Sequence, residues 1–258
     1  MTRLTGKPPK RRWLWWLLAV ALLGTACTAV FSTKLTDAPA EALARGQALL
    51  NKKTVLAIVA HPDDLEWYIG GTLKRLADNG ANVQVIVATD GEKGPNRVKS
   101  PNLAVTRRAE QAAAGQINGY TRIYSLALPD RGAAKDPRFL PEVTRIYNEV
   151  KPDAVFVFDP TSPSLPYLHV DHQGSAREFL KFWDTLPQSK PPVYLFQTRR
   201  PDVAVDISAV IDTKAQALAQ HISQNGGSGS RMQGFFAGSG KSVGVAYAEL
   251  FRLLEGGE

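Results

Sequence analysis

Short apolar runs alternate with segments of helical periodicity along most of the chain. Residues 54–60 (TVLAIVA) are almost continuously apolar and rich in β-branched side chains, which is typical of a buried strand in a parallel sheet. Further strands are predicted at residues 82–88, 122–126, 154–158, 193–196 and 203–207. Helical patterns lie between several of them, for example at residues 105–118 and 141–150. Because strands that alternate with helices form βαβ units, the pattern predicts an α/β, Rossmann-like three-layer fold with a mainly parallel sheet.

The amino terminus has a different pattern. Residues 13–31 form a run of 19 residues without a charge, and at about 1.5 Å per residue such a helix nearly crosses a hydrocarbon core of about 30 Å. Residues 1–12 contain five basic and no acidic residues, which favours a cytoplasmic amino terminus. The tryptophans at 13, 15 and 16 fit an interfacial aromatic belt. The pattern predicts a signal anchor over residues 1–32, hence a single-pass membrane protein whose remaining chain lies outside the cytoplasm.

Two other interpretations of the leader stay open. A cleaved signal peptide has the same basic start and a short apolar region, here residues 13–23, followed by small residues at 24–26. Cleavage would give a secreted or periplasmic protein. Alternatively, Cys27 could carry a lipid, since Ala26 suits the position before a lipidated cysteine.

Length and charge describe the rest of the chain. Residues 33–52 are predicted to be a tether and residues 53–258 one α/β domain of ordinary core size. The formal charge of +7 comes mostly from the leader, and the other 26 basic residues nearly balance the 24 acidic ones. Outside the leader the net charge is therefore small, and we expect no nucleic-acid binding. A single cysteine excludes an intrachain disulfide.

Two short runs contain three of the four histidines of the chain. Residues 61–64 (HPDD) follow the predicted strand at 54–60, and residues 169–172 (HVDH) follow a loop rich in proline and serine. Imidazole and carboxylate are the ligands of a catalytic zinc, which keeps a further position for water. Alone, the first run could be a polar turn with an aspartate cap and the second a surface loop. Together they indicate a metal site beyond the carboxyl ends of the strands.

Ordered motifs extend this pattern along the chain. They are residues 60–66 (AHPDDLE), 70–73 (GGTL), 89–94 (TDGEKG), Arg107, Glu110, 128–130 (LPD), 169–172 (HVDH), 205–208 (VDIS) and 221–224 (HISQ). With these motifs the chain resembles the PIG-L/LmbE-like family of zinc-dependent N-acetylglucosaminyl de-N-acetylases, over most of its length beyond residue 54. Two departures are Leu65, which separates Asp64 from Glu66, and Val170, where proline is frequent.

The resemblance implies a metal centre and its catalytic groups. His61, Asp64 and His172 match the zinc ligands of the family. Asp63 matches the general base, and His169 matches the histidine that stabilises the tetrahedral intermediate. The cofactor implied is Zn²⁺, although Fe²⁺ can take the same ligands.

Further roles are implied for residues around this centre. Asp171 matches a carboxylate that orients or tunes His169, and Arg107 matches an arginine that contacts substrate. Asp206 and His221 fall in family motifs and receive no role from the sequence.

The function expected is hydrolysis of an N-acetyl group on an N-acetylglucosamine-containing glycan, glycolipid or conjugate. A zinc ion makes water nucleophilic at neutral pH, and a carboxylate such as Asp63 can accept its proton. The sugar preference is implied by the resemblance alone. The alternatives are a metal-dependent amidase or esterase with a different acyl substrate, and a metal-binding or glycan-binding protein without turnover.

Glycine is concentrated near the carboxyl terminus. Six glycines lie within residues 223–240, which predicts a long mobile loop. Such a loop is either a connector or a lid over the substrate.

Overall fold

The computed structural model describes residues 33–161 and 170–255, and these residues form a seven-stranded sheet. The strand order is β3-β2-β1-β4-β5-β7-β6. The strands are β1 (Thr54–Val59), β2 (Asn82–Thr89), β3 (Arg122–Leu128), β4 (Ala154–Phe158), β5 (Val193–Phe196), β6 (Val203–Asp206) and β7 (Ala248–Leu254). Strands β1 to β5 pair parallel with one another, whereas β7 pairs antiparallel with β5 and β6. The prediction of an α/β fold with a mainly parallel sheet is confirmed.

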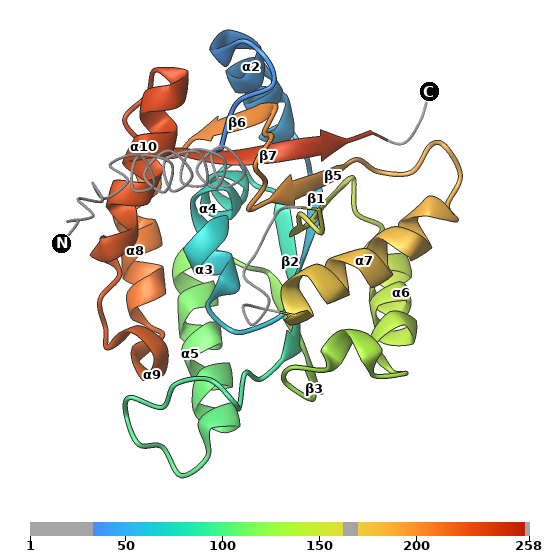
Figure 1. Cartoon of the computed structure of the whole chain (residues 1–258), viewed down its shortest axis with the longest axis vertical. Coiled ribbons are helices and arrows are strands. Elements are labelled where there is room, and N and C mark those ends of the chain that lie inside the picture. Colours follow the sequence, from blue (N-terminus) through green and yellow to red (C-terminus); the bar gives the residue numbers. More distant parts are fainter. Residues whose placement is uncertain (1–32, 162–169, 256–258) are drawn as a thin grey trace, which may run out of the picture. The chain divides into compact units, whose positions relative to one another are not determined.

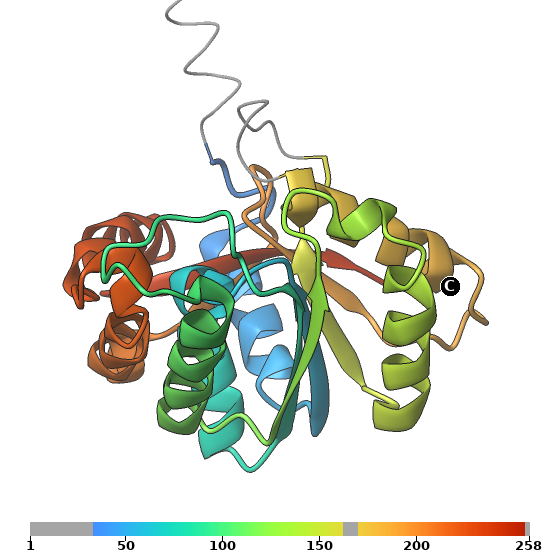
Figure 2. The same cartoon turned by 90° about the horizontal axis from the view of Figure 1, so that it is seen from below.

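Helices cover both faces of this sheet, as Figure 2 shows. They are α2 (Pro39–Leu49), α3 (Asp64–Tyr68), α4 (Gly70–Asp78), α5 (Leu103–Asn118), α6 (Phe139–Val150), α7 (Val170–Asp184), α8 (Ile211–Ala219), α9 (Ile222–Asn225) and α10 (Gln233–Val243). Short 3-10 turns lie at Ala133–Lys135, Ser208–Val210 and Ser230–Met232. Helices α6 and α7 pack on one face, and α4, α5 and α8 lie on the other. This arrangement explains why β1 and β4 are apolar throughout, since both of their faces are buried.

The segment 33–52, predicted as a tether, contains α2 and belongs to the folded unit Lys34–Glu258. Ala42, Gly46 and Leu49 are the buried positions of this helix, which lies beside β6 in Figure 1. A Cβ atom on Gly46 would lie 1.9 Å from the carbonyl oxygen of Ala204. Glycine therefore allows the helix to approach the strand, and the tether prediction is wrong for residues 39–49.

The glycine-rich segment 223–240 is also more ordered than predicted. It holds part of α9, a 3-10 turn and most of α10. Met232, Phe236, Gly240 and Val243 are buried, and their spacing of three or four residues gives one buried helical face. The high glycine content hid this periodicity, so the predicted long mobile loop is wrong.

Strand β7 was not predicted, and it contains a buried glutamate. The carboxylate of Glu249 accepts hydrogen bonds from the backbone N–H groups of Gly71 (2.9 Å) and Thr72 (2.7 Å) at the start of α4. The ammonium group of Lys214 on α8 lies 2.7 Å from the same carboxylate. Strand β7 thus satisfies the first turn of α4, which follows α3 and the run at residues 61–64.

The predicted signal anchor at residues 1–32 lies outside the described residues. Within residues 33–161 and 170–255, no helix is both long and apolar enough to cross a membrane.

Candidate active site

The candidate site lies beyond the carboxyl ends of β1 and β4. These two strands are neighbours in the sheet, and the strand order reverses between them. Such a reversal leaves a crevice because the connections on its two sides leave in opposite directions. His61 and Asp64 follow β1, while His172 lies in the first turn of α7, which follows β4 in the chain. The fold thus brings together two runs that are more than a hundred residues apart.

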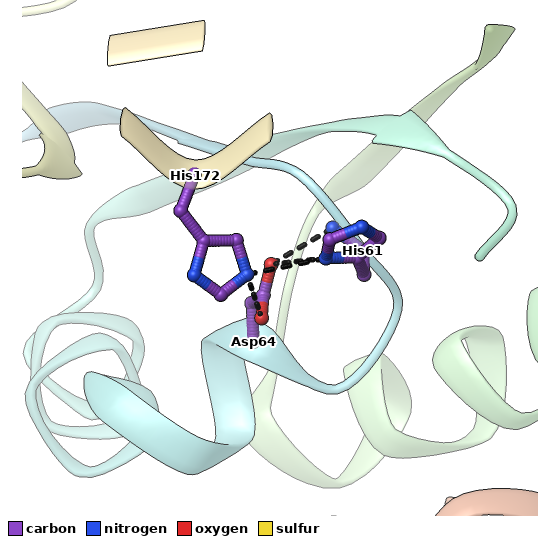
Figure 3. A group of neighbouring side chains, drawn as sticks. All are labelled: His61, Asp64 and His172. Carbon is purple, nitrogen blue, oxygen red and sulfur yellow. Dashed lines mark hydrogen bonds and ion pairs between the residues drawn. The ribbon is translucent and has the colours of Figure 1, made fainter. Parts of the chain in front are cut away.

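Three side chains converge at this crevice (Figure 3). His172 Nε2 lies 3.0 Å from Asp64 Oδ1 and 3.1 Å from His61 Nδ1. His61 Nδ1 lies 3.6 Å from Asp64 Oδ2. A tetrahedral zinc with bonds of 2.0–2.1 Å needs donor atoms about 3.3 Å apart. The three predicted ligands therefore form one of the groups among the described residues that could hold a metal ion, with donor distances compatible with those around zinc.

Both histidines are held by neighbouring groups. His61 Nε2 lies 3.1 Å from Asp130 Oδ1, and the Asp130 carboxylate also accepts the backbone N–H of Lys93 at 3.0 Å. The His172 ring stacks on Phe158 with ring centroids 3.9 Å apart. A carboxylate on the distal nitrogen of a metal-binding histidine fixes its tautomer and orientation. Asp130 was not identified as a site residue, although its position two residues after β3 is a signal for it.

Charge interactions tie His61 to these carboxylates. Burial lowers the pKa of His61, but hydrogen bonds with Asp130 and Asp64 outweigh burial and raise this pKa to about 10. Burial raises the pKa of Asp130, but its hydrogen bonds with His61 and the Lys93 backbone, together with the nearby positive charges, outweigh burial and lower this pKa to about 2. A metal at Nδ1 would take the place of one proton and leave the Nε2–H bond to Asp130 intact.

Asp63 precedes the ligand Asp64 in the chain, lines the same pocket and is not one of the three grouped side chains. Its backbone has a φ of 98°, in the left-handed region that few non-glycine residues adopt. Its N–H group donates to Gln111 Oε1 at 3.1 Å, and its Oδ1 lies 3.4 Å from Arg107 Nη2. Burial raises the pKa of Asp63 to about 6, although Arg107 acts to lower it. A carboxyl group with such a pKa is suited to general base catalysis near neutral pH.

Arg107 lies beneath the turn that carries Asp63. Its guanidinium group is buried, donates to the carbonyl oxygen of Gly91 at 2.8 Å and also donates to that of Pro62. Gly91 has a φ of 62°, and a Cβ atom there would lie 2.1 Å from Arg107 Nη1. Arg107 thus supports the turn from below and lines the pocket. Its predicted contact with substrate stays a prediction.

A buried polar network lies behind Asp63. His221 Nε2 lies 3.0 Å from Glu66 Oε2, and both side chains are fully buried. Glu66 also accepts hydrogen bonds from Tyr120 (2.9 Å) and Gln111 (3.2 Å), and Gln111 is the acceptor for the Asp63 N–H group. His221 therefore acts on Asp63 through two intermediate residues. Arg107, Gln111 and Asn118 share the buried face of α5, a sequence signal for a polar cluster that the sequence analysis did not use.

Asp171 binds the loop after β3. Its carboxylate accepts the backbone N–H groups of Arg131 (2.5 Å) and Ala133 (3.0 Å), and its Oδ2 lies 3.8 Å from His61 Nε2. His169 lies outside the described residues, so its predicted role and its pairing with Asp171 stay predictions.

Two other motif residues stabilise local structure. Glu110 accepts hydrogen bonds from the N–H group (2.7 Å) and hydroxyl group (2.6 Å) of Ser223, and so holds α9 against α5. Asp206 accepts the N–H group of Ser208 at 2.9 Å and closes the turn after β6.

The site opens into a pocket of about 760 Å³. His61, Asp63 and Asp64 lie in it, and Trp67, whose side chain is partly exposed, contributes an aromatic surface. This volume lies within the range of pockets that bind small organic ligands.

Comparisons with known proteins agree with this geometry. The family model described as PIG-L, GlcNAc-PI de-N-acetylase, matches residues 56–183. Diacetylchitobiose deacetylase of Thermococcus kodakarensis is 31% identical over 190 residues, which cover 67% of this chain and 70% of the relative. A probable N-acetyl-alpha-D-glucosaminyl L-malate deacetylase 2 of Bacillus cereus is 28% identical over 189 residues, covering 67% and 84%. The structure of N,N'-diacetylchitobiose deacetylase from Pyrococcus horikoshii superposes with a TM-score of 0.72 at 25% identity, covering 98% of this chain and 96% of that chain.

Proposed function

Because the chain belongs to the PIG-L/LmbE-like family of de-N-acetylases, we propose that it is a metal-dependent hydrolase that removes the acetyl group from an N-acetylglucosamine unit. That unit would be part of a glycan, a glycolipid or a smaller conjugate. The observation that carries the proposal is the convergence of His61, Asp64 and His172 beside Asp63, which is close to the three ligands and outside their group. Such a carboxylate serves turnover and has no purpose in a site that only binds metal.

The names of the two relatives support the sugar part of the proposal. One is a deacetylase of diacetylchitobiose and the other of an N-acetylglucosaminyl malate. Their substrates share an acetamido sugar and differ in the group attached to it. The pocket has room for a sugar of this size, and Trp67 offers an apolar ring surface for one face of it.

His61, Asp64 and His172 would hold the metal, with Zn²⁺ as the proposed ion and Fe²⁺ as the other candidate. A zinc ion bound there would supply Lewis acidity and lower the pKa of a bound water molecule toward about 7. His61 and His172 would bind through Nδ1 and Nε2, the two atoms that face each other at 3.1 Å.

Asp63 would accept the proton of the attacking water and later transfer it to the leaving amine. In this reaction the water oxygen bonds to the acetyl carbon, the C–N bond breaks, and acetate and a free amine are released. Arg107 keeps the Asp63 turn in place. His169 is proposed to donate to the carbonyl oxygen as negative charge develops there, with Asp171 as its partner; loss of one such donor typically lowers kcat about a hundredfold.

The test is acetate release by the full-length protein in nonionic detergent from a panel of N-acetylglucosamine derivatives. Asp63→Asn should lower kcat by about two to four orders of magnitude and leave the metal content unchanged, because Asp63 acts on the proton alone. His172→Ala should lose the metal as well as the activity. Elemental analysis measures the metal content of both variants.

Loss of metal in Asp63→Asn would contradict the assignment of Asp63 as the base. Absence of acetate from every derivative, with metal bound, would direct the search to another acyl substrate or to a binding function.

A further inference from the structure

Four cations surround the mouth of the pocket, and we call them the basic rim: Lys93, Arg97, Arg131 and Arg231. Lys93 and Arg97 lie between β2 and α5, Arg131 follows β3, and Arg231 lies in the 3-10 turn before α10. All four are exposed. Three segments far apart in the sequence thus contribute positive charge to one opening.

Within the described part of the chain, none of these cations forms an ion pair with a carboxylate. Arg97 Nε donates to the carbonyl oxygen of Gln224 (2.7 Å), Arg131 Nη2 to that of Lys93 (3.2 Å) and Lys93 Nζ to that of Asp130 (2.6 Å). Of the undescribed segments, 1–32 and 162–169 contain no aspartate or glutamate, and 256–258 contains one, Glu258.

Several other exposed arginines do form ion pairs. Arg108, Arg122, Arg138 and Arg145 each lie within ion-pair distance of an aspartate or glutamate, whereas Arg177 and Arg200, which lie outside the pocket lining, have no such pair among the described residues. The acidic residues of the pocket do not neutralise the rim, because they are engaged deeper in the site. Asp64 and Asp130 contact histidines, and Asp171 accepts two backbone N–H groups.

The rim is also held in place. The backbone N–H of Arg97 donates to the carbonyl oxygen of Ser223 at 3.0 Å, and Ser223 is in turn bound to Glu110 on α5. A cation that is positioned before the ligand arrives loses less conformational entropy on binding. A neutral sugar would leave this local positive potential unused.

We propose that the basic rim is an anion subsite, so that the substrate is an N-acetylglucosamine linked to a group bearing a carboxylate or a phosphate. This inference rests on the proposed function for the acetamido end of the substrate. The anion would lie at the pocket mouth, where arginine forms charge-assisted, frequently bidentate hydrogen bonds to such groups.

Three ligands of similar size test the subsite: the methyl glycoside of N-acetylglucosamine, its carboxymethyl glycoside and N-acetylglucosamine 1-phosphate. Calorimetric titration of the full-length protein in nonionic detergent gives their affinities. We expect one or both anionic ligands to bind about tenfold more tightly than the methyl glycoside. The anionic ligand that binds more tightly shows whether the subsite prefers a carboxylate or a phosphate.

The double variant Arg97→Gln/Arg231→Gln should reduce this preference by about threefold to tenfold, and added salt should reduce it in the wild type. Arg145→Gln removes one exposed charge outside the pocket lining and is the matched control; it should keep the preference. A preference that is absent in the wild type, or unchanged in the double variant, overturns the proposal.

The same ligand titrations are run with zinc present and again after chelation. They distinguish binding of the anion by the rim from binding of the anion by the metal. A preference that disappears on chelation and survives in the double variant arises from contact between the anion and the metal, and overturns the subsite. Acetate release is measured on the same ligands. Turnover without preference for an anion would overturn the subsite alone, whereas an Arg-dependent preference without turnover would overturn the proposed function alone.

Discussion

Glu66 and His221 form an ion pair that lies behind the turn of Asp63 and shares its supporting residue, Gln111. Neither member of the pair lines the pocket. Because the backbone of Asp63 is in the left-handed region, the turn depends on its hydrogen bonds and on the packing beneath it. His221 is therefore a positioning residue for Asp63, a role that its place in the sequence did not reveal.

The pH dependence of stability tests this role. Burial lowers the pKa of His221, but the hydrogen bond with Glu66 and the negative charges of the nearby carboxylates together outweigh burial and raise this pKa above its ordinary value. The folded protein then retains a proton that the unfolded chain releases near pH 6.5. The stabilisation is fully present below about pH 6.5 and is lost as the pH rises through the raised pKa of the folded state.

His221→Gln should lower the free energy of unfolding by about 2 kcal/mol at low pH and by less at high pH. Urea unfolding at about pH 6 and pH 9 measures both differences. The variant should also lower kcat more than it changes KM, since the position of Asp63 is affected. An equal loss of stability at both pH values would show that the pair contributes no pH-dependent charge interaction.

At the scale of single residues, the sequence predicts the candidate metal ligands better than it predicts the side chains that hold them in place. His61 and Asp64 could be placed because a buried strand ends directly before them. Asp130, which orients His61, comes from the end of another strand, and Glu66 meets His221 across 155 positions of the chain. A single sequence can indicate that such residues are near a site, but it does not show which distant residues pair, so these partners emerged only from the fold.

Among the elements, α2 shows how one glycine can determine whether a segment is folded against the sheet. Helix propensity alone predicts that Gly46→Ala stabilises a helix by about 1 kcal/mol. In the folded protein the added Cβ atom would collide with the carbonyl oxygen of Ala204. We therefore expect a loss of about 2 kcal/mol in the free energy of unfolding, measured by urea denaturation.

Gly238→Ala in α10 is the matched control. A Cβ atom at Gly238 would meet no atom within 4 Å, so this change should stabilise by up to about 1 kcal/mol. Stabilisation by both substitutions would mean that α2 does not pack on β6 and that the segment behaves as a tether after all.

The buried parallel strands were easier to predict than β7. Strands β1, β4 and β5 are buried on both faces over nearly all of their length, and their apolar runs are visible in the sequence. Strand β7 interrupts its apolar pattern with Glu249, whose charge is matched by Lys214 from another element. Tertiary pairing of this kind reverses the expectation that a charged residue is exposed.

At the scale of the whole molecule, the leader predicts where the protein is located. The uncharged run at 13–31 with its basic flank should place the full-length protein in the membrane fraction, with an intact mass that includes residues 1–32. Protease added from the non-cytoplasmic side should reach the domain. Fractionation combined with intact-mass spectrometry measures both points.

Cys27→Ala serves as the control for this experiment. Wild-type protein with a mass increase that Cys27→Ala abolishes would indicate lipidation, and a soluble protein without the leader would indicate signal cleavage. Either result would contradict the anchor.

The position of β7 has a consequence for biosynthesis. Among the seven described strands β7 is translated after the others, yet it lies between β5 and β6 in the sheet. On the ribosome, β6 therefore has no strand to pair with until residues 248–254 have emerged, and α4 lacks the carboxylate of Glu249 at its first turn. Translation that stops before this point yields a chain that already holds His61, Asp64 and His172 but has an unfinished sheet. The pairing of β6 and the first turn of α4, which lie far earlier in the sequence, thus both wait for the same seven residues.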